Sequence, residues 1–439
     1  MGARFTGLWR HADFLKLWAG QTVSVFGSLV TRFALPLVAV LTLEATPFQV
    51  ALVSALEVAP GLLVGLFAGV WVDRLPRRPI LIATDLGRAL LLGSVPLAAL
   101  LGALRIEQLY VVAFGTSLLS LFFEVAYRSY LPSLVRREEL VEGNSKLQAS
   151  GSVAEVAGFG LAGLLVQLLT APIAILVDAL TFVVSAVALL LIRRAEPPPV
   201  SEEHAGAEQG VWREIGQGLA TLWRLPAVRA IAGATATELF FIHIFVAVLL
   251  LYFVRELNLP PVLMGALFAI GGVSALVGAL FAGRVTRRFG LGRTMLGTMV
   301  LNRLATFFIP LAGGPLPLVS ALVAAEQTSD GIATIYQINQ TSLLQTIVPD
   351  RLQGRVNASL RVLEQAMILL GLLVGGALGQ VIGLRPTLFV GISGALLAVL
   401  WLYFSPIRAM RDFPAPPPER GQQEHLGLPE PATMVVPGS

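Results

Sequence analysis

The sequence contains no cysteine and only four histidines. The absence of cysteine excludes disulfides, thiolate metal sites and cysteine nucleophiles. Neither the H-E-x-x-H zinc motif nor the G-x-x-x-x-G-K-[ST] phosphate loop occurs in the 439 residues. We therefore expect no metal, no cofactor and no enzymatic site in this chain.

Charge is also scarce. Charged residues make up 13% of the chain and hydrophobic residues 55%, whereas soluble domains carry about 25% charged residues. A chain of this length with so little charge cannot cover a surface that faces water. The composition therefore predicts an integral membrane protein embedded in a lipid bilayer. The net charge of +4 is typical of basic cytoplasmic loops, so we expect no nucleic-acid partner.

Long apolar runs predict the membrane topology. A helical crossing needs about 20 mostly apolar residues, and continuous runs of this kind are not the alternating pattern of a membrane β-barrel. By this criterion the sequence predicts an all-α membrane protein with twelve transmembrane helices, near residues 14–41, 48–72, 79–103, 107–128, 147–169, 171–193, 225–253, 261–283, 293–313, 315–345, 362–384 and 386–405.

The basic residues predict the orientation. With both termini cytoplasmic, only Arg105, Arg255 and Arg385 lie on the outer side of the membrane. Three further arginines lie within predicted spans, and all other basic residues are on the inner side or at inner span ends. The positive-inside rule therefore favours cytoplasmic termini in a multi-pass protein of the plasma (inner) membrane.

The chain divides in the middle. Residues 1–193 and 225–405 each contain six predicted spans, and residues 194–224 include Pro197-Pro198-Pro199 and charged positions typical of a linker. Within the linker, residues 211–224 alternate apolar and polar positions at helical spacing, which predicts an interfacial helix. Residues 406–439 are expected to form a cytoplasmic tail, rich in Pro, Gly, Gln and Glu and disordered from Phe413 onward.

The two halves resemble each other at a shift of 213 to 214 positions. Asn144 recurs as Asn357, and Gly69 before the first basic loop recurs as Gly283 before the second. The glycine-spaced residues 158–163 have a counterpart in residues 371–376. Two parallel six-span repeats with a central linker predict two pseudo-symmetric six-helix bundles, a plan known from secondary transporters.

The loop after the second span carries a family resemblance. Residues 69–78 read G-V-W-V-D-R-L-P-R-R, which resembles the G-x-x-x-D-R-x-G-R-R loop of the major facilitator superfamily. The residues that match the motif are Gly69, Asp73, Arg74, Arg77 and Arg78. The resemblance implies a conformational gating role for them, because transporters of this plan rock one bundle against the other. Anchoring of the loop on the cytoplasmic side is the alternative.

Two spans resemble the drug- and siderophore-exporter branch of that superfamily. In the first span these residues are Gly20, Gln21, Ser24 and Gly27, followed by the segment 33–37. In span six, residues 178–185 carry the likeness. Some members of the branch have an acid at the position of Ser28. Glycines 158, 160 and 163 in span five resemble the glycine-rich fifth span that accompanies export, although close helix packing explains them equally well.

Ionisable residues within spans are costly and therefore informative. Asp85 and Arg88, three apart, and Glu124 and Arg128, four apart, are expected to form local ion pairs near the cytoplasmic ends of spans three and four. Deeper acids are candidates for proton coupling, because burial and neighbouring like charge both favour the protonated form of a carboxyl group. They are Glu57, Asp178, Glu238, Glu326 and Asp330. The alternative is that each acid is structural, hydrogen-bonded between helices or paired with Arg32 or Arg303.

A substrate cavity is expected between the bundles near the midplane. Amide, hydroxyl and aromatic groups suit bulky amphipathic molecules, and Tyr336 and Gln340 share a helix face. Arg32 could pair with a buried acid or an anionic substrate, or extend to the interface. The candidate cavity residues are Gln21, Ser24, Ser28, Arg32, Tyr127, Tyr336, Gln337 and Gln340.

The resemblance implies a secondary active exporter of a small organic compound, such as a drug, macrolide or siderophore-like molecule. Export would proceed by proton antiport with alternating access, and we expect a monomer. A facilitator or importer of a small metabolite with the same fold is the alternative, since a fold does not fix a substrate. A non-transporting membrane sensor fits less well, because such a protein has no need of acids in the middle of its spans.

Overall fold

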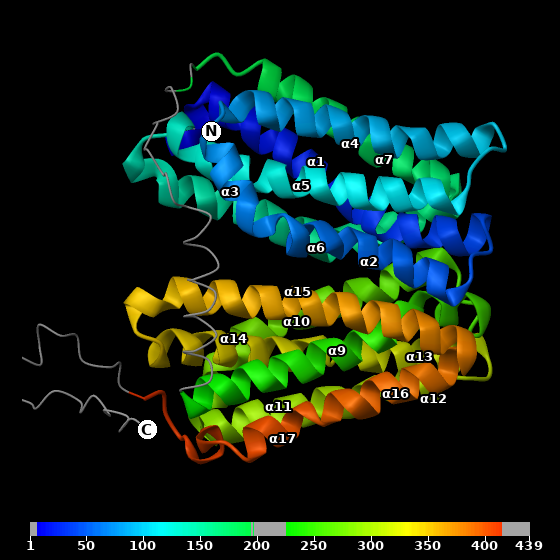
Figure 1. The fold of residues 1–439 in the computed structure, drawn as a ribbon, viewed down its shortest axis with the longest axis vertical. Helices are drawn as coiled ribbons and strands as arrows, with labels where there is room; N and C mark the ends of the chain where they lie inside the picture. Colours follow the sequence, from blue (N-terminus) through cyan, green and yellow to red (C-terminus); the bar gives the residue numbers. More distant parts are fainter. Residues whose placement is uncertain (1–6, 195, 197–224, 415–439) are drawn as a thin grey trace, which may run out of the picture.

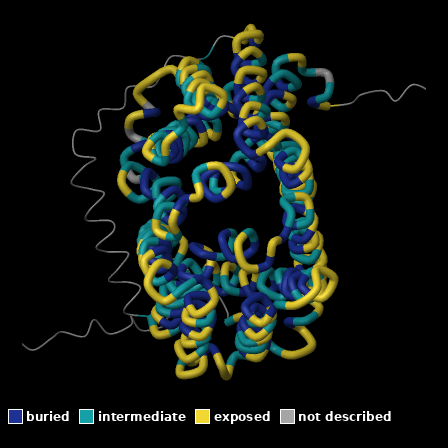
Figure 2. The backbone as a smooth tube through the Cα atoms, turned by 90° about the vertical axis from the view of Figure 1, so that its right-hand side faces the viewer, coloured by how far each residue is buried: buried dark blue, intermediate teal, exposed yellow. Residues whose placement is uncertain are grey.

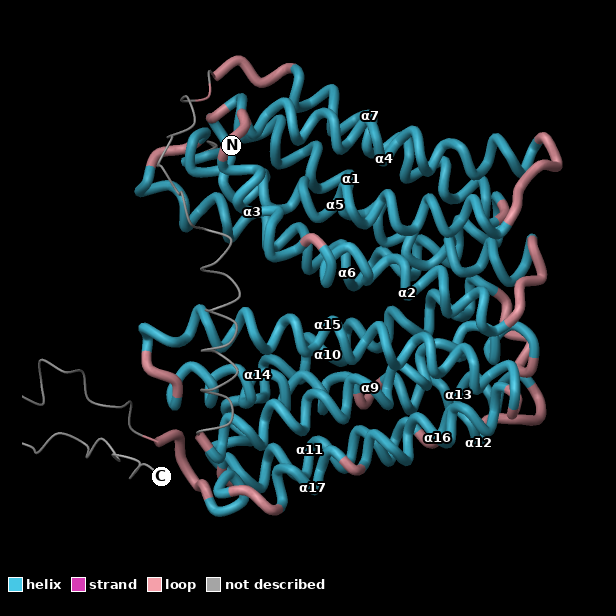
Figure 3. The backbone as a smooth tube through the Cα atoms, viewed as in Figure 1, coloured by secondary structure: helices cyan, strands magenta, loops and turns pink. Residues whose placement is uncertain are grey.

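The structure is a computed structural model that describes residues 7–194, 196 and 225–414. All regular elements in these ranges are helices, joined by short loops at two opposite ends (Figure 3). The interfacial helix expected at 211–224 and the tail from residue 415 lie outside the described residues.

The first bundle contains the helices of the first half. A short 3₁₀ helix, η1, precedes it, a π-helical turn, η2, extends α1, and η3 leads into α6. The elements are η1 (Gly7–Arg10), α1 (Ala12–Leu37), η2 (Val38–Thr42), α2 (Pro47–Leu63), α3 (Gly65–Asp73), α4 (Arg77–Leu100), α5 (Ile106–Leu134), η3 (Arg137–Glu139), α6 (Leu140–Leu169) and α7 (Ala171–Leu190).

The second bundle contains the helices of the second half, several of which are interrupted within a span. They are α9 (Pro226–Arg255), α10 (Pro261–Phe289), α11 (Leu291–Thr306), α12 (Phe308–Leu311), α13 (Leu316–Gln327), α14 (Asp330–Ile347), α15 (Asp350–Val381), α16 (Leu384–Leu396) and α17 (Ala398–Tyr403). The 3₁₀ helix η4 (Pro406–Ala409) follows.

The twelve predicted spans are confirmed. Ten are helices long and apolar enough to cross a membrane, and the other two are the interrupted pairs α2/α3 and α13/α14. The main difference is that α15 begins at Asp350 rather than near residue 362. An apolar criterion finds only the part of a helix that crosses lipid, whereas the helix itself continues through polar residues until something ends it.

The two bundles lie side by side with their helices roughly parallel to one another (Figure 1). Figure 2 views the helices roughly end-on and colours each described residue by its burial. The first and last described residues lie at the same end as Arg74, Arg78 and Arg287, which we call the basic end. The opposite end, which holds the α4–α5 and α12–α13 loops, is called the far end.

The bundles share an apolar core only in the half toward the far end. One cluster of buried residues combines Val30 and Ala51 of the first bundle with Val248 and Leu372 of the second. The remaining clusters each belong to a single bundle, one in the first and two in the second, and lie toward the basic end. The described helices therefore join at the far end and separate toward the basic end (Figure 1).

Glycines allow the bundles to approach at the far end. A Cβ atom on Gly163 of α6 would lie 3.0 Å from the Cα of Gly265 of α10 and as close as 2.5 Å to the carbonyl oxygen of Pro261. On the other side, Gly376 of α15 packs on Phe48 and Ala51 of α2. In addition, Arg255 donates to the carbonyl oxygen of Ala45 over 2.8 Å, which links the two bundles across the far end.

The first residues of the expected cytoplasmic tail are ordered in the structure. Residues 406–409 form η4. The carbonyl oxygens of Met410 and Arg411 accept hydrogen bonds of 2.9 Å from the backbone N–H groups of Gly292 and Leu291. These bonds satisfy free donors in the first turn of α11, which explains why the chain stays ordered here despite its polar composition.

We expect Gly265→Val to open the far end. The new side chain meets backbone atoms of Phe159 and Gly163 that cannot move independently, and overpacking of this kind costs about 1–3 kcal/mol. Because the chain has no cysteine, spin labels can be placed at Leu101→Cys and Leu316→Cys alone, both exposed at the far end. The distance distribution between the labels should shift to longer values.

The matched control is Gly297→Val on α11, where an added Cβ would meet nothing within 4 Å. This variant should keep the distribution of the parent protein. Equal distributions for both variants would contradict the role assigned to the α6–α10 crossing.

Candidate functional site

The basic loop after α3 is held by a residue that the sequence reasoning missed. Glu196 accepts hydrogen bonds from the backbone N–H groups of Arg77 and Arg78, over 3.0 and 3.1 Å, at the start of α4. Its carboxylate also pairs with the Arg77 guanidinium at 3.4 Å. A carboxylate at a helix N-terminus is favourable because it satisfies free donors and complements the helix dipole.

The same loop is tied to the end of α7. The Arg78 guanidinium donates to the carbonyl oxygens of Leu189 and Leu190, over 3.0 and 2.8 Å. Gly69 and Asp73 lie in α3, and Arg74 follows that helix and is exposed. The loop and the first residues of the linker thus form one assembly within the first bundle, in which Arg77 and Arg78 have bound partners.

A buried charge cluster lies in the middle of the first bundle. Arg88 pairs with Asp85, as the sequence predicted. Arg88 also lies over the rings of Phe123 and Phe182, at 4.4 and 4.1 Å from their centres, and donates to Ser120 over 3.3 Å. The expected position near the cytoplasmic end of the span was wrong, because Arg88 is the twelfth of the 24 residues of α4.

Asp178 of α7 belongs to the same region. Its side chain is 1% exposed and accepts hydrogen bonds from the hydroxyl groups of Thr31 in α1 and Thr181 in α7. The charge of Arg88 acts on it electrostatically. Gly27 makes this contact possible, because a Cβ there would collide with Asp178 and Thr181. The glycines of the first-span signature therefore have a packing role against α7.

Glu57 of α2 has a different environment. It is half-buried, and the charge of Arg32 in α1 acts on it without a direct ion pair among the described residues. Arg32 itself is exposed. The backbone carbonyl oxygen of Glu57 accepts a hydrogen bond from Ser117 of α5, which fixes α2 against α5 at this level.

A second charge cluster lies in the middle of the second bundle. Arg303 of α11 forms an ion pair of 2.7 Å with Glu238 of α9, and the two side chains are 10% and 19% exposed. Its charge also acts on Glu326 and Asp330. Arg303 therefore pairs with one of the five candidate acids and acts electrostatically on two others.

Glu326 and Asp330 are four residues apart, a spacing that predicts one shared face on a continuous helix. The structure differs from this prediction. Glu326 lies in α13 and Asp330 begins α14, because residues 328 and 329 interrupt the helix between them. The two acids remain close enough for their charges to interact. Asn302 of α11 holds the interruption by donating to the carbonyl and hydroxyl oxygens of Ser329, over 3.1 and 2.9 Å.

The candidate cavity residues differ in their surroundings. Ser24 is buried in α1, and the Ser28 hydroxyl bonds within its own helix. Gln340 donates to Thr235 over 2.9 Å, so its side chain points to α9. Gln337 is exposed and Gln21 is half-buried. Tyr127 stacks on Phe123. Tyr336 is 5% exposed and lies in the core of the second bundle.

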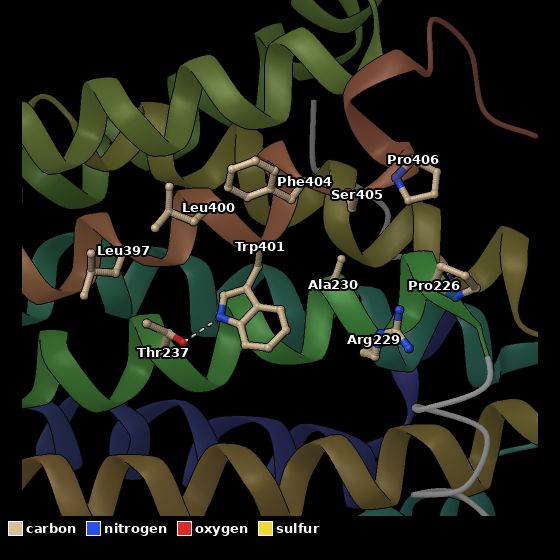
Figure 4. A pocket seen from close by; sticks show the side chains of 10 residues that line it. All are labelled: Pro226, Arg229, Ala230, Thr237, Leu397, Leu400, Trp401, Phe404, Ser405 and Pro406. Atoms are coloured by element: carbon tan, nitrogen blue, oxygen red, sulfur yellow. Dashed lines mark hydrogen bonds between the residues drawn. The ribbon is translucent and has the colours of Figure 1, made fainter.

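A pocket lies outside this set, on the surface of the second bundle between α9 and the last span (Figure 4). The Trp401 indole crosses it and donates to Thr237 over 3.0 Å, with Leu397, Leu400 and Phe404 beside it. A second pocket, at the basic end of the first bundle, is lined by residues that include Asp13, Lys16 and Arg194. Neither pocket contains a residue of the predicted site.

The described residues contain no group of three or more His, Cys, Asp or Glu side chains that could hold a metal ion. What the geometry offers instead is paired charge within a membrane span. Each bundle places one arginine among more carboxyl groups than it can neutralise, at mid-span depth. Such groups can bind and release protons, or attract a cation, without any metal chemistry.

Known proteins share both the sequence pattern and the fold. A family model described as Major Facilitator Superfamily matches residues 17–372. The chain is 29% identical to the multidrug efflux pump Tap of Mycolicibacterium fortuitum, over 90% of this chain and 96% of that protein. It is 26% identical to macrolide efflux protein A of Streptococcus pyogenes, over 48% of this chain and 51% of that protein.

A solved structure agrees in fold. A bacterial homologue of the iron transporter ferroportin in an inward-facing state has a TM-score of 0.73 at 18% identity. The match covers 91% of this chain and 99% of that one. At this identity the likeness concerns the arrangement of the helices alone.

The Asp85–Arg88 pair should be a main contributor to stability. Arg88→Ala leaves Asp85, which is 0% exposed, without its cation, and breaking a buried pair in this way costs about 3–5 kcal/mol. Thermal unfolding of the purified protein in detergent should therefore occur at a clearly lower temperature. Arg128→Ala is the control, because the Glu124–Arg128 pair is 60–69% exposed and such pairs contribute about 0–1 kcal/mol. Equal losses would refute the structural role of the buried pair.

Proposed function

Because the chain belongs to the major facilitator superfamily, we propose that it is a secondary active transporter that exports a small organic compound in exchange for protons. The observation that carries the proposal is the surplus of carboxyl groups in mid-span. Arg303 pairs with Glu238 and acts electrostatically on Glu326 and Asp330. A charge inside the bilayer is costly, so these acids favour occupancy by protons or by a cationic compound.

The arrangement of the bundles supports alternating access. Their common core lies toward the far end and their separate cores toward the basic end. If the basic end is cytoplasmic, as the positive-inside rule favours, the two bundles separate toward the cytoplasm. A compound could then enter from the cytoplasm between the bundles. We further propose a plasma-membrane location, cytoplasmic termini and a monomer.

The direction of transport is supported by the relatives. Tap and macrolide efflux protein A are named as efflux proteins, which favours export of drug-like or macrolide-like compounds by this chain. Proton entry can drive such export, since each elementary charge that crosses the membrane contributes about 2.3 kcal/mol per 100 mV. The five candidate acids and the cavity residues remain proposals within this mechanism, as does gating by the loop of residues 69–78.

Proton flux in energised inside-out vesicles is the direct test. A fluorescent pH dye should report collapse of the gradient when a transported compound is added from a panel of antibiotics, dyes and siderophores. Among Asp178→Asn, Glu57→Gln and Asp330→Asn, we expect the variant that lacks the proton carrier to fall to the rate of empty vesicles. Glu124→Gln, in the exposed pair, serves as the control and should behave as the parent protein.

A different outcome would identify a facilitator. In that case a labelled compound equilibrates across the membrane while no compound moves protons. The buried acids would then be structural, with Asp178 held by its threonine partners and Glu238 by Arg303.

A further inference from the structure

The pocket between α9 and the last span has no part in the predicted site. Its volume is about 610 Å³, and it is lined by the first three turns of α9 and by residues between 397 and 406. In Figure 1, α17 lies at the edge of the second bundle that is farthest from the first bundle. In a protein that spans the membrane, a pocket on this edge opens toward the lipid.

The pocket forms beside an interruption in the last span. The helix is interrupted at residue 397, where α16 ends and α17 begins. Before this point, Gly391 lies directly on the backbone of α9. After it, the Trp401 indole lies over Gly233 of α9 and donates to Thr237 over 3.0 Å. The two helices are therefore in backbone contact at glycine and are separated by an indole ring toward the basic end, which leaves space beside the ring.

The lining changes from charged to apolar along the pocket. Arg229 is the only charged group among the described residues that line it, and Pro226 lies near it at the end of the pocket where α9 begins (Figure 4). Leu397 lies at the opposite end (Figure 4). Between them, Leu400 and Phe404 are 49% and 80% exposed. Exposed apolar side chains of this kind are stable where lipid, rather than water, covers them.

The length of α9 indicates the depth of each end. The helix has 30 residues and is therefore about 45 Å long, close to the thickness of about 40–45 Å of a bilayer with its headgroup regions. Arg229, in the first turn, is thus expected at the level of the lipid headgroups. Thr237 lies about two turns further along the helix, at the level of the acyl chains.

The charged end is suited to a phosphate group. Arg229 is exposed, and a guanidinium has five N–H donors in a planar arrangement that matches phosphate, so it can bind one beside other partners. The first turn of α9 adds free backbone N–H groups and the positive end of the helix dipole. No acidic side chain occurs among the described residues that line the pocket, so the lining attracts an anion rather than a cation.

We propose that this pocket binds an anionic phospholipid from the leaflet at the basic end. Its phosphate lies at Arg229, and one acyl chain extends past Trp401 toward Leu397. A neutral zwitterionic lipid fills the apolar part equally well, but its own cationic group is repelled by the guanidinium. The headgroup is therefore selected by charge, as in other basic pockets between membrane helices. The inference is independent of the proposed exchange of protons.

Native mass spectrometry of the full-length protein tests the preference for the headgroup. The protein is incubated in detergent with equal amounts of phosphatidylglycerol and phosphatidylcholine of the same chain length. Adducts with phosphatidylglycerol should exceed those with phosphatidylcholine. Arg229→Gln should reduce this preference about fivefold, the contribution of one arginine near a membrane surface.

The matched control is Arg284→Gln, which removes the same charge at the same end of the bundle. Arg284 is exposed near the end of α10 and does not line the pocket. This variant should keep the preference of the parent protein. A parent protein without preference, or an equal reduction in the two variants, would overturn the proposal.

Tryptophan fluorescence tests where the lipid binds, because brominated acyl chains quench an indole that they contact. In lipid-reconstituted protein, the part of the fluorescence that is lost in Trp401→Phe reports on the pocket. Brominated phosphatidylglycerol should quench this part at a lower mole fraction than brominated phosphatidylcholine does.

Two results of the quenching experiment would contradict the site. Equal quenching by both lipids would show that Trp401 contacts bulk lipid only, even if the mass spectra show a preference. Protection of Trp401 from both lipids would show that another part of the chain or a transported compound fills the pocket. Either result would overturn the proposal.

Discussion

The cost of charge inside a membrane governs the arrangement of this protein. Twelve spans contain few ionisable residues, and two arginines at mid-span depth each form an ion pair with an acid. Arg88 with Asp85, and Arg303 with Glu238, each remove much of the penalty of a buried charge by direct pairing. Because pairing is incomplete at Arg303, the same constraint that stabilises the fold leaves residual negative charge where protons or a cation can bind.

Glycine determines how the two bundles meet. At the α6–α10 crossing, Gly163 and Gly265 let two backbones approach without side chains between them, as small residues commonly do in membrane helices. A comparable role belongs to Gly376 of α15 against α2. The far end is therefore closed, while at the basic end each bundle has its own core.

The halves are repeats with different chemistry at equivalent positions. In the first bundle, aromatic rings and threonine hydroxyl groups enclose the central charges and tie α1 to α7. In the second bundle, the central arginine lies beside an interrupted helix whose turn is held by Asn302 and Ser329. The two bundles thus stabilise their central charges with different sets of neighbours. Glu196 fixes the basic loop to the first bundle by accepting hydrogen bonds at the start of α4.

The amino-acid sequence by itself determined the membrane class, the number of spans, the likeness of the halves and the identity of the mid-span acids. These follow from composition and from apolar runs, which depend on neighbours along the chain. The pairing of Asp85 with Arg88 was also predictable, because a helix brings residues three apart together. Only the tertiary structure decided that Glu238 pairs with Arg303 and that Tyr336 lies inside a bundle. It also decided that the interruption at residues 328 and 329 separates two acids whose spacing would place them on one helix face. Such contacts join different helices. The rotation and depth of each helix are set by packing between spans, which no local pattern in the sequence encodes.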